Sequence, residues 1–395
     1  MKEGGTTPFL RLNNFLILIC TVALILGCEK ESITTLEEAN ASAKRSANTG
    51  PYEFTAPVYD IAAAPDGSIL VGVNEGENRI VRQIKNGKIS NLAEFTAPTA
   101  LQGIAPVGAG NAFVTTGGTD LAEHGELYRV SNGNVRMVAD LGAYESTNDP
   151  DANAGIQWKD PLCEAIDGFT AGPQNNPFNV VALTGGTALV ADAAGNTLLS
   201  ATATGNIDWK AIFTPPVDEN GEWIIRWYAM DENEEMIPCY VQPVPTSIAV
   251  GNNGYIYVGE LTGALAEEDG LPIGLSRVWK IPADANNVVC TETSGDCQVF
   301  LDGLTSVIDL AIGPDGLLYV VEFDEMSWIA SFAPDLAAGG TITSYDTETG
   351  ELVEIVASGL SFPSAITFDK KGNLWLLKNN DIVLEGYPPT VRMLQ

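Results

Sequence analysis

One apolar phrase recurs six times along this chain and restricts its fold more than any other feature. Residues 245–260 show it most clearly, as a short apolar strand, a tight glycine turn and a second apolar strand that ends on Glu260. Residues 307–322 are its closest copy. Further copies begin at Val58, Leu101, Pro177 and Pro363. A unit that is repeated in this way indicates a repeat architecture rather than a single large sheet.

Two more strands follow each of the first copies, and turns such as Asn86-Gly87 and Asn132-Gly133 join them. Asparagine-glycine pairs favour two-residue hairpins between alternating apolar strands. Four short strands per unit, at a spacing of about forty residues or more, are typical of propeller blades. We therefore predict an all-β chain whose residues 51–395 form a six-bladed β-propeller of four-stranded antiparallel blades. Residues 52–58 are expected to complete the last blade.

The charge of the chain excludes one class of partner. Its 395 residues contain 51 acidic and 20 basic side chains, which gives a formal net charge of −31. Phosphate backbones would be repelled by such a surface, so we expect no nucleic-acid partner. Cations and uncharged ligands are compatible with it.

The N-terminus is typical of an exported lipoprotein. Lys2 and Arg11 precede an apolar run over residues 15–26, which is short for a membrane-spanning helix. The run ends in Leu-Gly-Cys, the lipobox pattern in which Cys28 is lipidated. We predict a signal peptide over residues 1–27, a flexible tether over 28–50 and a lipid anchor in the bacterial cell envelope. Glu29 favours the outer membrane, with the protein facing the periplasm or the outside; an ordinary signal peptide is the alternative.

Four cysteines remain beyond the targeting segment, an even number in an oxidising compartment. Cys290 and Cys297 flank a polar turn, so we expect a disulfide that clamps a hairpin. Cys163 and Cys239 then pair by elimination. None of these spacings resembles a zinc site.

The spacing between the six copies is uneven, and the extra residues are informative. Insertions occur at residues 143–176, 214–244, 263–276 and 323–340. The alternating direction of blade strands predicts that most of them lie on one rim of the ring. Insertions gathered on one face of a repeat protein usually mark its binding face.

The blade phrases resemble the ScyD/ScyE family of propeller proteins, which is named from scytonemin pigment gene clusters. The matching stretches are residues 176–186, 190–196, 258–263 and 308–316. The likeness spans roughly residues 58–376 and implies a six-bladed propeller. It implies little about chemistry, because one fold supports many activities. The cysteine-bearing insertions and the lipobox depart from the family pattern.

Two rings of equivalent positions supply the candidate ligands. The starts of the first strands place Asp60, Asn179 and Asp309 on alternate blades, and these oxygen donors suit a hard cation such as Ca²⁺. The ends of the second strands place Asp192, Glu260 and Glu322 on successive blades, as ligand-binding candidates at the same mouth. The alternative is a purely structural role, in which these acids accept hydrogen bonds from backbone N–H groups of adjacent blades or are solvated in the channel.

Aromatic residues in the second insertion offer another candidate site. Trp223 and Trp227 lie among carboxylates, an arrangement that suits a sugar or a cationic ligand. The alternative is that they form the small core that orders a long loop. His124 is the only histidine of the chain, so a serine–histidine catalytic arrangement would have to use it.

These observations favour an envelope propeller, monomeric and non-catalytic, that binds a small molecule or a protein at its acidic, loop-rich mouth. The first alternative is a Ca²⁺-dependent hydrolase of the gluconolactonase-like type. That family resembles a propeller with Glu-Gly-Pro and Pro-Asn-Gly signatures at the starts of its inner strands, and these are absent here. The second alternative is a structural envelope scaffold. No cofactor other than Ca²⁺ is suggested.

Overall fold

The computed structural model describes residues 49–118, 124–153, 163, 173–184, 186–266, 269–380 and 387–394. The chain divides into two compact units, Met1–Lys44 and Arg45–Gln395, and all described residues belong to the second. The predicted signal peptide, Cys28 and the tether up to residue 48 lie outside the described residues. None of the helices in the described part is long and apolar enough to cross a membrane.

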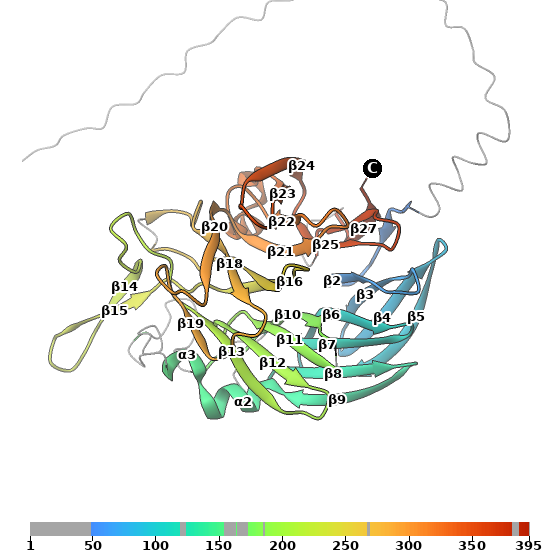
Figure 1. Cartoon of the computed structure of the whole chain (residues 1–395), viewed down its shortest axis with the longest axis horizontal. Helices are drawn as coiled ribbons and strands as arrows, with labels where there is room; N and C mark the ends of the chain where they lie inside the picture. Colours follow the sequence, from blue (N-terminus) through green and yellow to red (C-terminus); the bar gives the residue numbers. More distant parts are fainter. Residues whose placement is uncertain are drawn as a thin grey trace, which may run out of the picture. The chain divides into compact units, whose positions relative to one another are not determined.

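The second unit is built from six antiparallel sheets, each of which is one blade (Figure 1). Blade 1 contains β2 (Val58–Ala63), β3 (Ile69–Glu75), β4 (Asn78–Lys85) and β5 (Lys88–Thr96). Blade 2 contains β6 (Ala100–Gly108), β7 (Asn111–Gly117), β8 (Glu126–Ser131) and β9 (Asn134–Asp140). Blade 3 contains β10 (Pro177–Ala182), β11 (Thr187–Asp192), β12 (Thr197–Thr202) and β13 (Ile207–Phe213).

The other three blades follow the same order from the inner strand outwards. Blade 4 contains β16 (Pro245–Val250), β17 (Tyr255–Glu260), β18 (Ser276–Pro282) and β20 (Gln298–Leu304). Blade 5 contains β21 (Val307–Ile312), β22 (Leu318–Glu322), β23 (Gly340–Tyr345) and β24 (Leu352–Leu360). Blade 6 contains β25 (Pro363–Phe368), β26 (Leu374–Lys378), β27 (Thr390–Met393) and β1 (Tyr52–Glu53). The predicted all-β, six-bladed propeller is confirmed.

The two ends of the described chain close the ring. β1 pairs antiparallel with β27, so the first strand of the domain is the outer strand of the last blade. The inner strands β2, β6, β10, β16, β21 and β25 contact one another in this order around the centre. This pairing confirms that the N-terminal segment completes the last blade, although only Tyr52–Glu53 pair there and Val58 begins β2 of blade 1. β1 covers the edge that β27 would otherwise expose.

The core lies in six apolar clusters, each between two neighbouring blades. Successive side chains of a strand point to opposite faces, so each strand serves two clusters. In β3, Val71 packs in the cluster shared with blade 6, and Leu70 packs in the cluster shared with blade 2. The period-two apolar pattern of the sequence therefore fills both faces of every blade.

The four predicted insertions connect strands at one rim of the ring, because inner strands start there and second strands end there. The first insertion holds α2 (Leu141–Asn148) and α3 (Pro150–Asn153), and the second holds the hairpin of β14 (Ile225–Met230) and β15 (Met236–Tyr240). The insertion in blade 5 holds the short helices η4 (Trp328–Phe332) and η5 (Pro334–Leu336). Figure 1 shows the β14–β15 hairpin projecting away from the blades.

Blade 3 has a fifth strand that the sequence pattern did not predict. β19 (Val288–Cys290) belongs to the connection between β18 and β20 of blade 4, but it pairs parallel with β13 of blade 3. The side chain of Thr214 donates a hydrogen bond to the carbonyl oxygen of Cys290 (2.7 Å) and ties the end of this strand to blade 3. β19 thus covers an edge that would otherwise offer unpaired backbone groups.

Both predicted disulfides are present. Cys163 is bonded to Cys239 of β15, so the first two insertions are joined across blade 3. Cys290 is bonded to Cys297. The predicted hairpin around this second disulfide is wrong, because β19 pairs with β13 and not with β20, the strand that follows Cys297.

Candidate functional site

All six inner strands carry a bulge at the same place, and this bulge shapes the candidate site. In five blades the strand register shifts just after the first paired residue of the inner strand, and in blade 2 it shifts after the second, Leu101. A bulge re-aims the side chains beside it. The first-strand positions Val58, Leu101, Pro177, Pro245, Val307 and Pro363 pair with Val73, Thr116, Asp192, Glu260, Glu322 and Lys378. The two rings of equivalent positions are therefore real features of the fold.

Asp60 spans two blades. Its carboxylate accepts hydrogen bonds from the backbone N–H of Ile61 (2.7 Å) and from that of Ile104 on the neighbouring inner strand β6 (2.8 Å). The side chain is only 6% exposed. Burial raises the pKa of Asp60 to about 7, and the two hydrogen bonds oppose that shift.

Asp309 repeats this arrangement in blade 5. Its carboxylate accepts a hydrogen bond from the N–H of Ile366 on the next inner strand β25 (2.6 Å). Burial and the nearby charge of Asp60 raise the pKa of Asp309 well above its usual range. Asp60 and Asp309 thus hold equivalent positions on blades 1 and 5, and each carboxylate bridges to the next inner strand.

Small and polar residues complete this ring. Gly103 and Ala365 take the equivalent positions on blades 2 and 6, and a Cβ at Gly103 would come within 3.0 Å of the Cα of Asn179. Asn179 is 9% exposed and Ser247 is fully buried. Within the described part of the chain, Oδ1 of Asn179 and Oγ of Ser247 have no hydrogen-bond partner. Asn179 thus offers an unused carbonyl oxygen in the ring that holds both aspartates.

Asp192 is held by donors of its own blade. It accepts hydrogen bonds from the N–H groups of Asn176 (2.6 Å) and Gly195 (3.0 Å) and from the amide of Asn175. It is fully buried. These contacts hold the residues just before β10 against the end of β11, which is a structural role for this carboxylate.

Glu260 forms a buried ion pair with Arg277 and accepts a hydrogen bond from the indole N–H of Trp279 (2.8 Å). Arg277 also donates to Glu292 and to the carbonyl oxygen of Thr214. Burial raises the pKa of Glu260, and the guanidinium of Arg277 opposes that shift. This carboxylate joins blade 4 to the second insertion.

Glu322 is the most accessible of these three acids, at 8% exposure. It accepts a hydrogen bond from the N–H of Thr305 (2.6 Å). Burial raises its pKa to about 7, and the charge of Glu325 adds to this shift. The three predicted ligands Asp192, Glu260 and Glu322 thus lie at equivalent positions, but each is engaged by groups of its own or the neighbouring blade.

The two predicted tryptophans lie apart from the inner ring. Trp223 stacks edge-on against Tyr240 at a centroid distance of 5.2 Å, and both pack against Ile212 of β13. Trp227 belongs to β14, where the guanidinium of Arg226 lies 5.1 Å from its ring centroid. Trp223 therefore orders the second insertion against blade 3, as the alternative interpretation expected.

The structure adds an acidic group that the sequence analysis missed. Ligand oxygens of Glu145, Asp149 and Asp151 all lie within 4.8 Å of one another, and Glu145 and Asp151 are fully buried. Asp151 accepts a hydrogen bond from the amide of Asn196 (3.1 Å). The only sequence signal was a helical spacing of four between Glu145 and Asp149 inside the first insertion.

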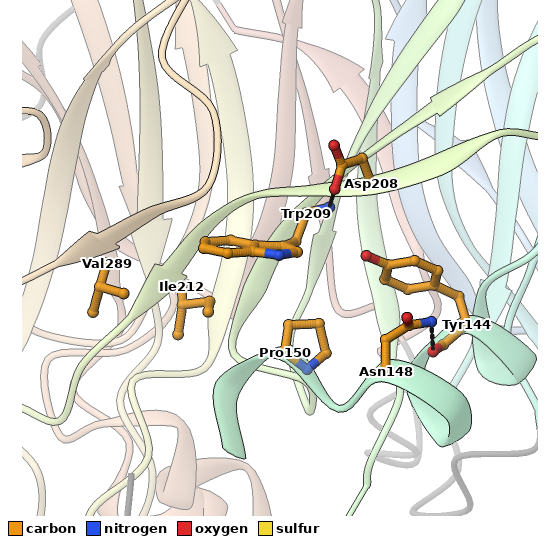
Figure 2. Close-up of a pocket in the computed structure, with 7 residues that line it drawn as sticks. All are labelled: Tyr144, Asn148, Pro150, Asp208, Trp209, Ile212 and Val289. Carbon is orange, nitrogen blue, oxygen red and sulfur yellow. Dashed lines mark hydrogen bonds between the residues drawn. The ribbon is translucent and has the colours of Figure 1, made fainter. Parts of the chain in front are cut away.

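A pocket of about 330 Å³ lies beside this acidic group, at the outer edge of blade 3. The first insertion contributes one side of it and the outer strands contribute the other (Figure 2). Its lining residues are Tyr144, Asn148, Pro150, Asp208, Trp209, Ile212 and Val289. None of them was a predicted site residue. The pocket joins the first insertion, β13 and β19, and β19 comes from a connection in blade 4.

Comparison with solved structures supports the propeller fold. A protein assigned as an oxidoreductase (glucose dehydrogenase) from Thermus thermophilus is 14% identical, with 88% of this chain and 100% of that chain covered and a TM-score of 0.50. A gluconolactonase from Xanthomonas campestris is 11% identical over 87% of this chain and 88% of that chain, with a TM-score of 0.45. The calcium-binding protein regucalcin from Agrobacterium tumefaciens is 10% identical over 87% of this chain and 93% of that chain, with a TM-score of 0.47.

The sequence matches no protein family profile and no curated protein. The resemblance to the ScyD/ScyE family is therefore borne out only as a likeness to six-bladed propellers. The expectation of a non-catalytic binding propeller is corrected by the comparisons, because a solved structure with this fold is assigned as an enzyme. The propeller fold gives no support to a non-catalytic role.

Proposed function

We propose that the protein is a hydrolase of lactones or esters that works at the loop-rich mouth of the propeller. The observation that carries this proposal is the pair of buried acids at equivalent positions on blades 1 and 5: burial raises the pKa of Asp60 to about 7, and burial together with the charge of Asp60 raises that of Asp309 well above its usual range. Buried carboxyl groups with pKa values near 7 are suited to general acid–base catalysis.

The proposed reaction uses both protonation states of the pair. One carboxylate accepts a proton from a water molecule as its oxygen attacks the carbonyl carbon of the substrate. The protonated partner donates its proton to the alkoxide oxygen as the ester bond breaks. The products are the carboxylic acid and the alcohol, and the pair again carries one proton. General acid–base catalysis of this kind contributes about 10²–10⁴-fold to the rate.

The same ring has the donors that Ca²⁺ prefers. Asp60, Asp309 and Asn179 offer oxygen ligands, and Oδ1 of Asn179 is buried without a hydrogen-bond partner in the described part of the chain. These residues fit a cation when both carboxyl groups are ionised, so a bound ion would take the place of the protonated partner in the acid–base step. When bound, Ca²⁺ would polarise a substrate carbonyl oxygen.

An activity assay tests the proposal with 4-nitrophenyl acetate and δ-valerolactone, each with Ca²⁺ and with EDTA. We expect hydrolysis by the natural protein and a loss of kcat/KM of about 100-fold in Asp60→Asn and Asp309→Asn. Asp66→Asn is the matched control, because Asp66 lies in the turn of the same blade at the opposite rim. The kcat/KM of this control variant should stay within about twofold of that of the natural protein. Absence of hydrolysis under every condition, or unchanged activity in both ring variants, contradicts the proposal.

Thermal unfolding with added Ca²⁺ locates the ion. A ligand that binds only the folded state raises the midpoint, and we expect a rise of a few degrees in the natural protein. Asn179→Ala should remove this rise, whereas Asp151→Asn should keep it. The reverse result would place the cation at Glu145, Asp149 and Asp151 and exclude the ring as its site.

The proposed setting of this activity is the bacterial cell envelope. The lipobox at Cys28 supports a lipid-anchored monomer at the outer membrane, and the stretches described above support kinship with the ScyD/ScyE family. Labelled palmitate fed to expressing cells should be incorporated into the protein and not into Cys28→Ala. Equal labelling of both proteins would contradict the anchor.

A further inference from the structure

The pocket at the outer edge of blade 3 is separate from the proposed catalytic ring. Its volume of about 330 Å³ lies at the lower end of the range for small-molecule sites, about 300–1,000 Å³. Two insertions from different parts of the chain form its walls, the α2–α3 segment and β19. The site therefore exists only in the folded ring and fits a small group.

An aromatic surface lies in the middle of this pocket. Figure 2 shows the indole ring of Trp209 with Tyr144 and Pro150 on the side of the helical segment and Ile212 and Val289 on the side of the strands. Trp209 also packs against the buried Ile212, so its ring is held in place. Trp209 is only partly buried, which leaves part of the ring accessible.

The charge around this aromatic surface is negative. Asp208 lines the pocket, and burial together with the charge of Asp208 raises the pKa of the Tyr144 hydroxyl. The helical wall that supplies Tyr144 also carries the clustered acids Glu145, Asp149 and Asp151. No lysine or arginine is among the described residues that line the pocket.

We propose that this pocket binds a small organic cation, an ammonium group that lies against the face of Trp209. A cation above a tryptophan ring is attracted by the ring quadrupole, and a carboxylate within a short distance adds to this attraction. Anionic ligands are disfavoured by the carboxylate of Asp208, the one charged residue among the described residues that line the pocket. A neutral sugar would use the aromatic face but would gain nothing from the surrounding charge.

Calorimetric titration with choline tests the proposal. We expect choline to bind with one site per chain, and its uncharged isostere 3,3-dimethylbutan-1-ol to bind at least tenfold more weakly, because the two differ in charge and hardly in shape. Methyl glucoside should not bind. Equal binding of choline and the isostere, tighter binding of the sugar, or absence of choline binding each overturns the proposal.

Substitutions in the pocket test whether the cation binds there. Trp209→Leu should weaken choline binding at least fivefold, Trp209→Phe should retain part of it, and Asp208→Asn should weaken it by a smaller factor. Trp328→Leu is the control, because Trp328 lies in η4 of blade 5 and does not line the pocket. Circular dichroism checks that each variant is folded. Unchanged choline binding in a folded Trp209→Leu, or an equal loss in Trp328→Leu, contradicts the assignment.

Discussion

Acidic residues at equivalent positions of this propeller differ in the hydrogen-bond donors and charges that surround their carboxyl groups. Asp192 and Glu260 are both fully buried, and each is surrounded by donors that hold a carboxylate in place. Asp60 and Asp309 accept hydrogen bonds from backbone N–H groups and have no basic partner, whereas Glu260 has the guanidinium of Arg277 to oppose the effect of burial on its pKa. Residue type and ring position could be predicted from the sequence, whereas the donors depend on loops and neighbouring blades.

The pH dependence of stability should report the Asp60–Asp309 pair. A carboxyl whose pKa is higher in the folded state than the usual 3.8 binds more protons when folded, so stability falls as pH rises from about 4 to 7. We expect a decrease in the free energy of unfolding on the order of 2–4 kcal/mol across this window. Asp60→Asn should flatten this slope in urea denaturation series.

Asp66 is the control for the sign of this effect. The hydrogen bond from Lys85 and those from Ser68 lower the pKa of Asp66 to about 2. Its stabilising contribution is therefore lost as pH falls from about 4 to 2, and Asp66→Asn should leave the slope above pH 4 unchanged. An equal change of that slope in Asp60→Asn and Asp66→Asn would contradict the assignment to the pair.

The buried ion pair of Glu260 predicts a large effect from a single substitution. Arg277→Met removes the guanidinium and leaves a carboxylate that is 0% exposed, which should cost about 3–5 kcal/mol of unfolding free energy. Adding Glu260→Gln to this variant should restore part of the loss, because the uncompensated charge disappears. Urea denaturation of the three proteins measures both effects. A double variant no more stable than Arg277→Met would show that Glu260 is not charged in the fold.

At the scale of elements, sequence neighbours and structural neighbours differ most around blade 3. The residues around Cys290 and Cys297 are close in sequence and suggested a hairpin, but β19 pairs with β13, which lies far earlier in the chain. β19 lies beside the outer strand of blade 3, and the hydrogen bond from the hydroxyl of Thr214 to the carbonyl oxygen of Cys290 holds its end there. A local turn signal cannot reveal that a neighbouring blade offers a free edge.

The two disulfides should contribute unequally to stability. Cys163 and Cys239 are 76 residues apart, whereas Cys290 and Cys297 are seven apart. In the chain-entropy view, losing the first should cost about 4 kcal/mol and losing the second about 2 kcal/mol. Paired Cys→Ala variants compared by thermal unfolding measure this difference. A larger loss in the Cys290/Cys297 variant would show that native packing, not loop closure, dominates.

At the scale of the whole molecule, closure by β1 is the feature with the widest consequences. Val391 of β27 pairs with Tyr52, and Phe54 beside this strand is 2% exposed within the cluster that blades 1 and 6 share. A ring of blades buries both faces of each sheet only when the last blade is complete. The strand that closes the ring comes from the opposite end of the domain, so its loss should affect the whole fold.

Truncation tests this closure. A protein that begins at Ala56 lacks β1 and Phe54, and we expect it to lose about 3–5 kcal/mol of unfolding free energy, comparable to the removal of a buried phenylalanine. A protein that begins at Thr49 keeps both and should unfold at the same temperature as the longer chain. Thermal unfolding compares them. Equal midpoints for the two truncated proteins would contradict a stabilising role of the closing strand.

The sequence by itself determined the number of blades, the position of the inner ring and the rim that bears the insertions. These follow from local periodicity and turn chemistry, which each repeat carries within about sixty residues. The tertiary structure alone decided the rest. The pairing of β19 with β13, the hydrogen bonds from the next inner strands to Asp60 and Asp309, and the pocket around Trp209 all join residues from different blades. Their contacts arise only when the ring closes, because no local pattern encodes which side chains meet across it.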